Sequence, residues 1–326
     1  MKLGIIGAGA WGTALAQVAS ADHVETLVWA LEAEVVRSIN ERRENPAFLS
    51  GIRLNESIRA TGDLSEVGDC DALLIVTPVQ HMRGVLEQTP VADKPLILCA
   101  KGIEEQSARL LHQVALEVCP RAPIAVLSGP TFAHEVAAGL PTAVTLATQD
   151  FELAERLRDR ISRPTFRIYI SDDVAGAEIG GAVKNVLAIA CGVVEGRRLG
   201  QNARAALIAR GFAEMRRFGM VFGAKLETLS GLAGLGDLFL TCSSTSSRNY
   251  SLGIGIGQGR PAAELLSNRT TVAEGAFTAP VLARLAREKG VDMPIVEAVD
   301  ALVEGRASVD EVLDGLLSRP PRAEGV

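Results

Sequence analysis

The stretch Lys2-Leu-Gly-Ile-Ile-Gly7-Ala-Gly9-Ala-Trp-Gly12 decides the fold of the first half of this chain. An apolar run suited to a buried strand is followed at once by glycines with the spacing G-x-G-x-x-G and then by a helical pattern. In such a unit Gly7 makes a tight turn, Gly9 lets phosphates approach the backbone, and Gly12 allows close helix packing. The stretch therefore predicts a dinucleotide-binding strand–turn–helix.

Short apolar runs alternate with helical patterns through the first half of the chain, and the strand signal ends after about Ser171. Strands that are buried on both faces are continuously apolar, so the alternation predicts a mostly parallel sheet with helices on both faces. We expect strands at Lys2–Ile6, Glu25–Trp29, Ala72–Thr77, Leu96–Cys99, Ile124–Leu127, Ala143–Ala147 and Phe166–Ile170, and then helices at about 173–196, 202–218, 247–257, 261–267, 278–288, 293–304 and 308–317.

These elements give an α/β chain with two domains. We expect an N-terminal Rossmann-type dinucleotide-binding domain with a mostly parallel sheet at 1–172, and an all-helical substrate and catalytic domain at 173–318. The polar tail at 319–326 is expected to be disordered.

Composition excludes some classes of protein. The 326 residues are 48% hydrophobic and carry a net charge of −6, which is not the basic footprint of a nucleic-acid binder. Aromatic residues make up 4% of the chain, too few for base-stacking platforms. The five cysteines and four histidines are scattered without metal-ligand spacing. We therefore expect no metal, no nucleic acid, and cysteines buried as small apolar side chains in a reducing compartment.

The apolar segment from Val174 to Val194 is long enough to raise the question of a membrane span. Glu178, Lys184 and Asn185 lie within it, and such side chains favour a buried helix of a soluble protein. No signal peptide is visible at the N-terminus. We expect a cytoplasmic protein without membrane insertion.

Lys184 is unusual because lysine is almost never fully buried without a partner. An apolar setting lowers the pKa of an amine, and such amines often carry out chemistry. The alternative is a lysine that extends from a core helix to water. Residues at i+4 spacing share a helix face with Lys184, and their small size would let another backbone or a ligand approach closely. They are Gly176, Gly180, Ala188 and Gly192.

Polar or glycine-containing turns follow three expected strands: Thr77-Pro78, Ala100-Lys101-Gly102 and Ser128-Gly-Pro-Thr-Phe-Ala133. Ligands of parallel sheets bind at the carboxyl ends of the strands. Lys101 is thus suited to an anionic or carbonyl substrate, and the alternative is a solvated loop lysine.

Three segments of the second half are polar or rich in glycine. Ser230-Gly-Leu-Ala-Gly-Leu-Gly-Asp237 is interpreted as a flexible approach to a carboxylate, with a helix N-cap as the alternative role of Asp237. The segment from Thr241 to Asn249 offers hydroxyls, backbone N–H groups and Arg248 at a helix start, which suits a phosphate; a plain surface charge is the alternative. Val272-Ala-Glu-Gly275 is interpreted as a capping region.

Cofactor preference depends on the end of the second expected strand, Trp29-Ala-Leu31-Glu32. An acidic residue here bonds the ribose 2′-hydroxyl of NAD, whereas a basic residue favours the 2′-phosphate of NADP. Glu32 is suitably placed, and no Lys or Arg lies between Trp29 and Val36. Glu32 at the start of a solvated helix is the alternative. We expect NADH to be used at least as well as NADPH.

Together these segments resemble the bacterial NAD(P)-dependent glycerol-3-phosphate dehydrogenase family, from Gly7 to about Val299. The resemblance rests on seven motifs that occur in the same order: GAGAWGTALA from Gly7, AKGIE at Ala100–Glu104, LSGPTFAHEVA at Leu127–Ala137, VKNVLAIACG around Lys184, TLSGLAGLGDLFLTC at Thr228–Cys242, SSRNY at Ser246–Tyr250, and VAEG at Val272–Gly275. Family members often carry a basic residue where this chain has Leu31, which weakens the expectation of an NADPH preference.

The resemblance implies hydride transfer between NAD(P)H and dihydroxyacetone phosphate, giving sn-glycerol 3-phosphate for glycerophospholipid synthesis. It implies Lys184 as proton donor or acceptor, with Lys101 and Asp237 completing the catalytic set, and it implies that the glycine face beside Lys184 leaves room for nicotinamide and substrate. The implied substrate residues are Lys101, Gly129, Thr131, Lys184, Asn185, Asp237, Thr241, Ser247, Arg248 and Asn249. The implied cofactor residues are Gly7, Gly9, Ala10, Trp11, Gly12, Leu31, Lys101, Ala133, Arg248, Val272 and Glu274.

Two other hypotheses stay open from the sequence. One is a different dehydrogenase with a Rossmann-type and a helical domain, of the ketopantoate or hydroxyacyl-CoA type; the Ser247-Arg248-Asn249 phosphate site argues against it. The other is a nucleotide sensor without turnover, which would not need Lys101, Lys184 and Asp237 together. The expected partner is a small-molecule triose phosphate, with a homodimer as the common default for enzymes.

Overall fold

The computed structural model describes residues 1–21, 23–267 and 273–320, and the chain forms two compact units. The sheet unit consists of residues 1–100 and 111–177, and the helical unit consists of residues 101–110 and 178–326. Residues 101–110, including Lys101, thus group with the helices although they follow a strand. The domain limits expected from the sequence stay a prediction, and most of the expected tail lies outside the described residues.

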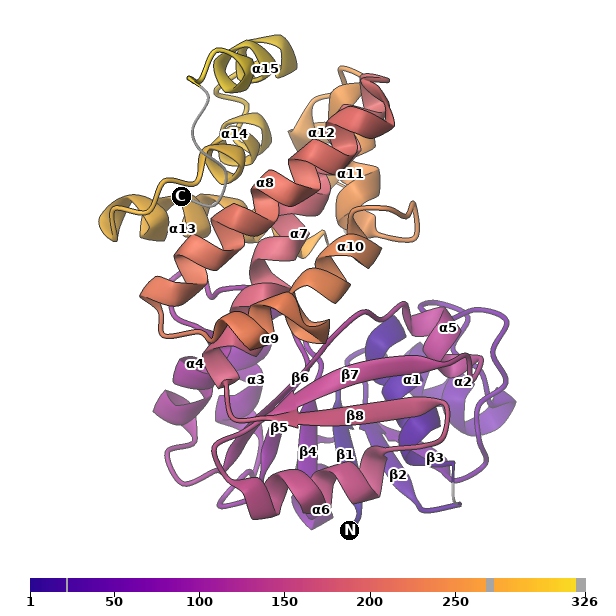
Figure 1. Cartoon of the computed structure of the whole chain (residues 1–326). Coiled ribbons are helices and arrows are strands. Elements are labelled where there is room, and N and C mark those ends of the chain that lie inside the picture. Colours follow the sequence, from indigo (N-terminus) through magenta and orange to yellow (C-terminus); the bar gives the residue numbers. More distant parts are fainter. Residues whose placement is uncertain (22, 268–272, 321–326) are drawn as a thin grey trace. The chain divides into compact units, whose positions relative to one another are not determined.

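The sheet unit contains one eight-stranded sheet in the order β3-β2-β1-β4-β5-β6-β7-β8 (Figure 1). All neighbouring strands are parallel except β6 and β7, which are antiparallel. The expectation of a mostly parallel sheet is confirmed. The strands are β1 Leu3–Ile6, β2 Thr26–Trp29, β3 Ile58–Thr61, β4 Ala72–Ile75, β5 Leu96–Leu98, β6 Ile124–Ser128, β7 Thr142–Ala147 and β8 Phe166–Ser171.

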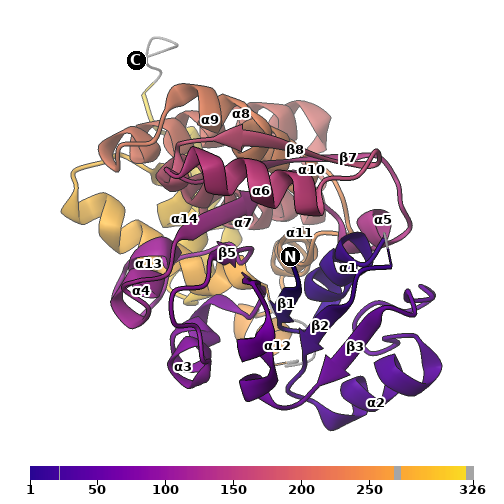
Figure 2. The same cartoon turned by 90° about the horizontal axis from the view of Figure 1, so that it is seen from below.

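Helices cover both faces of this sheet. The chain moves from β1 to β2 in one direction and from β4 to β5 in the other, so right-handed crossovers place their helices on opposite faces. Figure 2 shows α1 on one side of the sheet and α3 and α4 on the other. The helices of this unit are α1 Ala10–Ala19, α2 Ala33–Arg42, α3 Met82–Gln88, α4 Leu111–Val118, α5 Ala133–Ala137 and α6 Phe151–Ile161, with short 3-10 turns at Leu64–Asp69 and Val79–His81.

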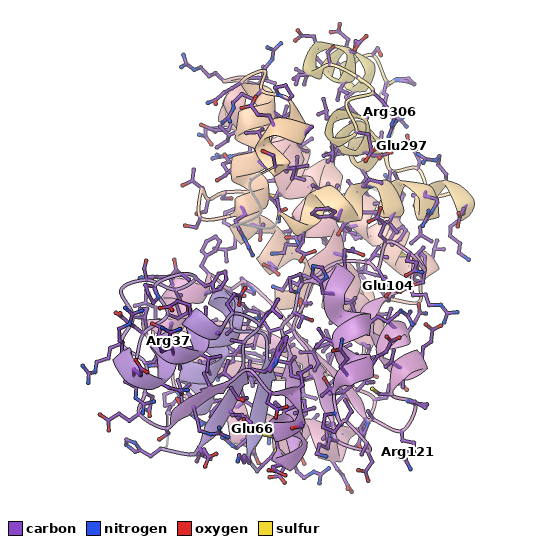
Figure 3. The ribbon with its side chains drawn as sticks, turned by 180° about the vertical axis from the view of Figure 1, so that it is seen from behind. Arg37, Glu66, Glu104, Arg121, Glu297 and Arg306 are labelled. Carbon is purple, nitrogen blue, oxygen red and sulfur yellow. The ribbon has the colours of Figure 1, made fainter. Side chains whose placement is uncertain are left out.

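The sequence analysis missed strand β3. It is the edge strand next to β2, and its second residue, Arg59, is exposed and pairs with Glu66, which is labelled in Figure 3. An edge strand needs no continuous apolar run because one side of its backbone has no neighbouring strand. The apolar pattern that identified the other strands is therefore absent here.

The helical unit is built around α7, which begins in the sheet unit and continues into this one (Figure 1). Its helices are α7 Val174–Gly196, α8 Gly200–Val221, α9 Leu226–Ser230, α10 Asp237–Thr241, α11 Arg248–Gly257, α12 Ala262–Leu266, α13 Glu274–Glu288, α14 Pro294–Val303 and α15 Val309–Leu317, and a π-helical turn spans Leu232–Gly236. The expected all-helical second half is confirmed for the described residues, but α9, the π-helical turn and α10 were not expected.

Helix α7 is long and apolar enough to cross a membrane, yet its most apolar window is entirely buried within the protein. Core helices of soluble proteins have the same length and composition, so α7 is weak evidence for a membrane span. The five cysteines are buried and form no disulfide, as expected from their spacing.

The glycine face of α7 serves backbone packing, which corrects the interpretation that it leaves room for nicotinamide and substrate. A Cβ at Gly180 would lie 2.3 Å from the carbonyl oxygen of Ala233, and a Cβ at Gly192 would lie 2.1 Å from that of Tyr250. Real Cβ atoms do not approach this closely. The space beside Gly180 and Gly192 is therefore filled by other backbone segments of the helical unit.

Candidate active site

Asp237 lies at the centre of a buried polar cluster in the helical unit. Its side chain has no exposed surface, and both oxygens accept hydrogen bonds from lysine. Lys184 Nζ donates to Oδ1 at 3.0 Å, and Lys101 Nζ donates to Oδ2 at 2.6 Å. Thr241 accepts from Lys184 Nζ at 2.8 Å and donates to Oδ1 of Asp237 at 3.2 Å. One carboxylate thus holds two ammonium groups and a hydroxyl.

The glycine-rich segment before Asp237 is ordered helix, and its interpretation as a flexible approach was wrong. The π-helical turn Leu232–Gly236 leads directly into α10, whose first residue is Asp237. A Cβ at Gly234 would lie 1.9 Å from the carbonyl oxygen of Leu229, so the glycines permit tight coiling. Such π-helical turns are frequent at functional sites. Here the turn places a carboxylate against α7, and Asp237 does not act as an N-cap.

Burial dominates the electrostatics of Lys184. Desolvation lowers its pKa from 10.5 to about 8; the charge of Asp237 opposes the shift and that of Lys101 adds to it. The sequence left open whether burial or the carboxylate has the larger effect, and in the structure burial does. An amine with a pKa near neutrality can both give and take a proton at physiological pH.

Asp237 shows the reverse balance. Burial alone would raise its pKa, but the charges of Lys101 and Lys184 and their hydrogen bonds hold the pKa below its usual value. Asp237 is therefore a carboxylate at neutral pH, and it offsets part of the cost of burying the ammonium group of Lys184.

Two buried amides connect this cluster to three other segments. Asn185 Nδ2 donates to the carbonyl oxygen of Lys101 at 3.3 Å, and Asn249 Nδ2 donates to Asn185 Oδ1 at 3.0 Å. Asn249 Oδ1 accepts the backbone N–H of Gly275 at 2.9 Å. The amide pair thereby joins α7, α11, the start of α13 and the Lys101 segment, and each amide has one further N–H.

The first turn of α11 presents Arg248. Ser247 is the N-cap, and its Oγ accepts the backbone N–H of Tyr250 at 3.2 Å. Arg248 keeps an exposed surface, and none of the hydrogen bonds among the described residues uses its guanidinium. Partial desolvation lowers the pKa of Arg248 from its usual value, and the nearby Glu274 at the start of α13 opposes the shift. A positive group and a helix N-terminus together suit a phosphate.

The sheet unit has the features of a dinucleotide site. Gly7 has a φ of +116°, in the region that favours glycine, and a Cβ at Gly12 would lie 1.8 Å from the carbonyl oxygen of Gly7. A Cβ at Gly9 would meet nothing within 4 Å, which leaves open space over the turn before α1. These positions match the turn, packing and phosphate-approach roles of the three glycines.

Buried polar atoms without partners support a ligand in the sheet unit. Trp11 Nε1, Thr77 Oγ1 and Ser128 Oγ make no hydrogen bond among the described residues. Trp11 lies in the first turn of α1, Thr77 follows β4, and Ser128 ends β6, so all three lie near the carboxyl ends of parallel strands. Buried polar groups are normally satisfied, so these atoms fit a bound dinucleotide. The sequence analysis did not single out Thr77 or Ser128 as site residues, although both occur in its strand-end turns.

The other expected site residues are distributed between the units. Ala10 begins α1 and Ala133 begins α5, whereas Leu31 follows β2 and is 78% exposed. Gly129 and Thr131 lie in the sheet unit directly after β6, where the Thr131 hydroxyl donates to the Gly129 carbonyl oxygen at 3.3 Å. Val272 lies outside the described residues. Within the described part of the chain, no group of three or more His, Cys, Asp or Glu side chains could hold a metal ion.

The chain matches two family profiles. Residues 2–154 match the NAD-dependent glycerol-3-phosphate dehydrogenase N-terminus, and residues 173–314 match the C-terminus of the same family. A glycerol-3-phosphate dehydrogenase [NAD(P)+] of Erythrobacter litoralis is 61% identical over 323 residues, covering 99% of this chain and 98% of the relative. The enzyme of that name from Novosphingobium aromaticivorans is 63% identical over 324 residues, with the same coverage.

Solved structures agree with the sequence relatives. The crystal structure of glycerol-3-phosphate dehydrogenase from Coxiella burnetii superimposes with a TM-score of 0.93 at 37% identity and covers 98% of this chain and 99% of its own. A D-mandelate dehydrogenase with NADH superimposes with a TM-score of 0.64 at 16% identity over 94% of this chain and 98% of its own, which shows a shared fold only. From its sequence and its fold, the chain belongs to the NAD-dependent glycerol-3-phosphate dehydrogenase family.

Proposed function

We propose that the protein interconverts dihydroxyacetone phosphate and sn-glycerol 3-phosphate with NAD(P)H, and that Lys184 is its acid–base group. The observation that carries this proposal is the buried cluster in which Asp237 accepts hydrogen bonds from Lys184 and Lys101. Reduction of a ketone needs a hydride and a proton. When bound, the nicotinamide supplies the hydride, so the protein must supply the proton and hold the substrate.

Lys184 has one N–H left for the substrate. An ammonium group has three donors, and those of Lys184 reach Asp237 and Thr241, with no third partner in the described part of the chain. The remaining donor would bond the ketone oxygen and transfer its proton as the alcohol forms. In the reverse direction the neutral amine would accept the proton from the alcohol. Lys101, held by the same carboxylate, would stabilise the oxygen as it gains negative charge.

Arg248 is the group that we assign to the substrate phosphate, together with Ser247 and Asn249 at the start of α11. Asn249 uses its carbonyl oxygen on Gly275 and one N–H on Asn185, so only its second N–H can reach a ligand. The guanidinium has no such commitment and can bond two phosphate oxygens at once. We therefore expect Arg248 to provide most of the phosphate affinity.

Replacing Arg248 with alanine is expected to raise the KM for dihydroxyacetone phosphate by roughly 10- to 100-fold with a smaller change in kcat. Hydrogen bonds to a charged group contribute roughly 1.5–3 kcal/mol, which corresponds to this range. Steady-state kinetics at saturating NADH measure it. Arg260→Ala removes an exposed arginine that pairs with Glu264 and is the matched control. An unchanged KM in Arg248→Ala would place the phosphate elsewhere.

For the cofactor, we expect NADH to be used at least as well as NADPH. Glu32 is exposed at the N-cap position of α2 without a side-chain cap bond, so its carboxylate is free to bond a ribose hydroxyl and would repel a 2′-phosphate. Leu31→Arg should shift the ratio of kcat/KM values toward NADPH. Comparing kcat/KM for the two cofactors tests the preference, and a tenfold NADPH advantage in the unmodified protein would contradict it.

One assay separates the proposed function from its rivals. Purified protein is mixed with NADH or NADPH, and absorbance loss is followed on adding dihydroxyacetone phosphate, ketopantoate or a 3-ketoacyl-CoA. Oxidation with dihydroxyacetone phosphate alone supports the proposal. Oxidation with one of the other ketones supports the corresponding rival dehydrogenase. Cofactor binding without turnover of any ketone supports a nucleotide sensor.

The setting of this activity follows from the same proposal. The product would feed glycerophospholipid synthesis, and the absence of clustered cysteines accords with a cytoplasmic enzyme. A homodimer is the oligomer we propose, since twofold dimers are the commonest assembly of soluble enzymes. Sedimentation velocity on the purified chain would test the dimer.

A further inference from the structure

Helices α7 and α11 touch through their backbones at two glycines. A Cβ at Gly192 of α7 would lie 2.1 Å from the carbonyl oxygen of Tyr250, and a Cβ at Gly253 of α11 would lie 2.0 Å from that of Ile189. Neither helix can move closer, and neither glycine can carry a side chain without separating the helices. The separation of the two helices is therefore determined at this contact by main-chain atoms.

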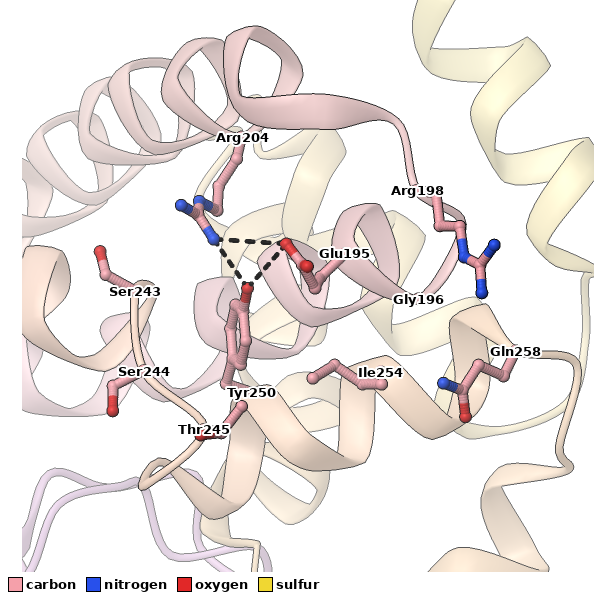
Figure 4. A pocket seen from close by; sticks show the side chains of 10 residues that line it. All are labelled: Glu195, Gly196, Arg198, Arg204, Ser243, Ser244, Thr245, Tyr250, Ile254 and Gln258. Carbon is pink, nitrogen blue, oxygen red and sulfur yellow. Dashed lines mark hydrogen bonds and ion pairs between the residues drawn. The ribbon is translucent and has the colours of Figure 1, made fainter.

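Side-chain hydrogen bonds on either side of the two glycines hold the same pair of helices in register. On one side Asn249 donates to Asn185 at 3.0 Å. On the other side the Tyr250 hydroxyl donates to Glu195 Oε2 at 3.3 Å and accepts from Arg204 at 3.0 Å (Figure 4). Backbone contact limits the separation of the helices, and these bonds oppose sliding of one along the other.

The residues next to these contacts are the two that the proposed reaction needs. Lys184 precedes Asn185 on α7, and Arg248 precedes Asn249 on α11. We propose that the α7–α11 contact sets the distance between the Lys184 ammonium and the Arg248 guanidinium, and thereby selects a three-carbon ketone that carries a phosphate. Gly192 and Gly253 are then positioning residues. This inference rests on the proposed function.

A small change at this contact would matter because both ends of the substrate would be held. The ketone oxygen must lie within hydrogen-bond distance of Lys184 while the phosphate is bonded to Arg248. A displacement of about 1 Å from the productive geometry can cost roughly 10²-fold in rate. Tyr250, Ile254 and Gln258 on α11 line a cavity of about 510 Å³. Because this face of α11 borders open space, the helix can shift without clashing there.

The test compares two glycines of the same helix. Gly253→Ala forces α11 away from α7, whereas a Cβ at Gly255 would meet only the end of the Leu265 side chain of α12 at 2.7 Å, which can rotate aside. The readout is the ratio of kcat/KM for dihydroxyacetone phosphate to kcat/KM for dihydroxyacetone, which lacks the phosphate. Loss of folded protein lowers both values equally, whereas a misplaced Arg248 lowers only the first.

We expect the ratio to fall by at least about tenfold in Gly253→Ala and to change by less than about threefold in Gly255→Ala. The Kd for NADH should stay unchanged in both variants, because the glycine loop for the dinucleotide lies in the sheet unit. Tyr250→Phe, which adds no volume, should lower the ratio by roughly threefold and serves if Gly253→Ala does not fold.

Two negative results are distinguishable. If the unmodified protein reduces dihydroxyacetone phosphate but the ratio is unchanged in Gly253→Ala, or in Tyr250→Phe where Gly253→Ala is not folded, the positioning role is wrong and the proposed function stands. If the unmodified protein does not reduce dihydroxyacetone phosphate at all, the proposed function is wrong, and the inference is overturned with it.

Discussion

Lys184→Ala is expected to lower kcat for dihydroxyacetone phosphate reduction by at least about 10²-fold, while NADH binding survives. General acid catalysis by a positioned group contributes roughly 10²–10⁴-fold, and Lys184 is the amine whose burial brings its pKa to about 8. The dinucleotide loop, Gly7 to Gly12, belongs to the other unit, so cofactor affinity should not depend on this side chain. Steady-state kinetics and NADH fluorescence titration measure the two effects.

The matched control for this variant is Lys289→Ala. Lys289 lies at the C-terminal end of α13 with its ammonium 6.0 Å from the ring of Phe222, and it is exposed. Its removal should leave kcat within about twofold, because exposed substitutions rarely affect a distant site. Near-normal turnover in Lys184→Ala would remove Lys184 from the mechanism.

Asp237→Asn is the second change with a large expected effect. It removes the charge that raises the pKa of Lys184 and leaves desolvation and the charge of Lys101, both of which lower it. The pKa of Lys184 should fall below about 8, so less of the amine is protonated at neutral pH. We expect kcat/KM for the reduction at pH 7.5 to fall by at least about 10²-fold, since the proton donor is depleted and loses its orienting partner.

The pH profile provides the distinguishing measurement. In the unmodified protein, reduction needs the protonated amine, so kcat/KM should decline as pH rises through about 8; oxidation needs the neutral amine and should decline as pH falls through the same value. In Asp237→Asn both limbs should move to lower pH. Limbs that stay in place would show that Asp237 does not control the protonation of Lys184. Glu264→Gln, which alters an exposed pair with Arg260, is the control.

Much of the fold followed from one-dimensional patterns. The interior strands of a parallel sheet are buried on both faces, so their apolar runs are visible in the sequence, and the expected strands from Lys2–Ile6 to Phe166–Ile170 all overlap observed ones. Edge strand β3 was missed because Arg59 interrupts its pattern. The turns from α9 to α10 were missed because glycine usually disfavours helix, whereas here tertiary packing requires the absence of side chains.

The polar residues of the site could be nominated from the sequence but not arranged. Lys184 was identifiable because a charge in an apolar segment is costly, and Arg248 because it begins a helix after a run of hydroxyls. That Lys101 shares a carboxylate with Lys184 involves residues separated by more than 130 positions and has no local signal. The same is true of the amide pair Asn185 and Asn249, whose partners lie on four different segments.

The sequence by itself determined the class of fold, the dinucleotide loop at Gly7–Gly12 and the presence of a buried amine at position 184. These follow from periodicity, spacing and the cost of burying charge, which act locally. Only the tertiary structure decided the charge balance at Lys184 and the purpose of the glycines on α7. Desolvation and the opposing charges of Asp237 and Lys101 depend on distances in space, and a glycine's neighbour is known only when another backbone is packed against it.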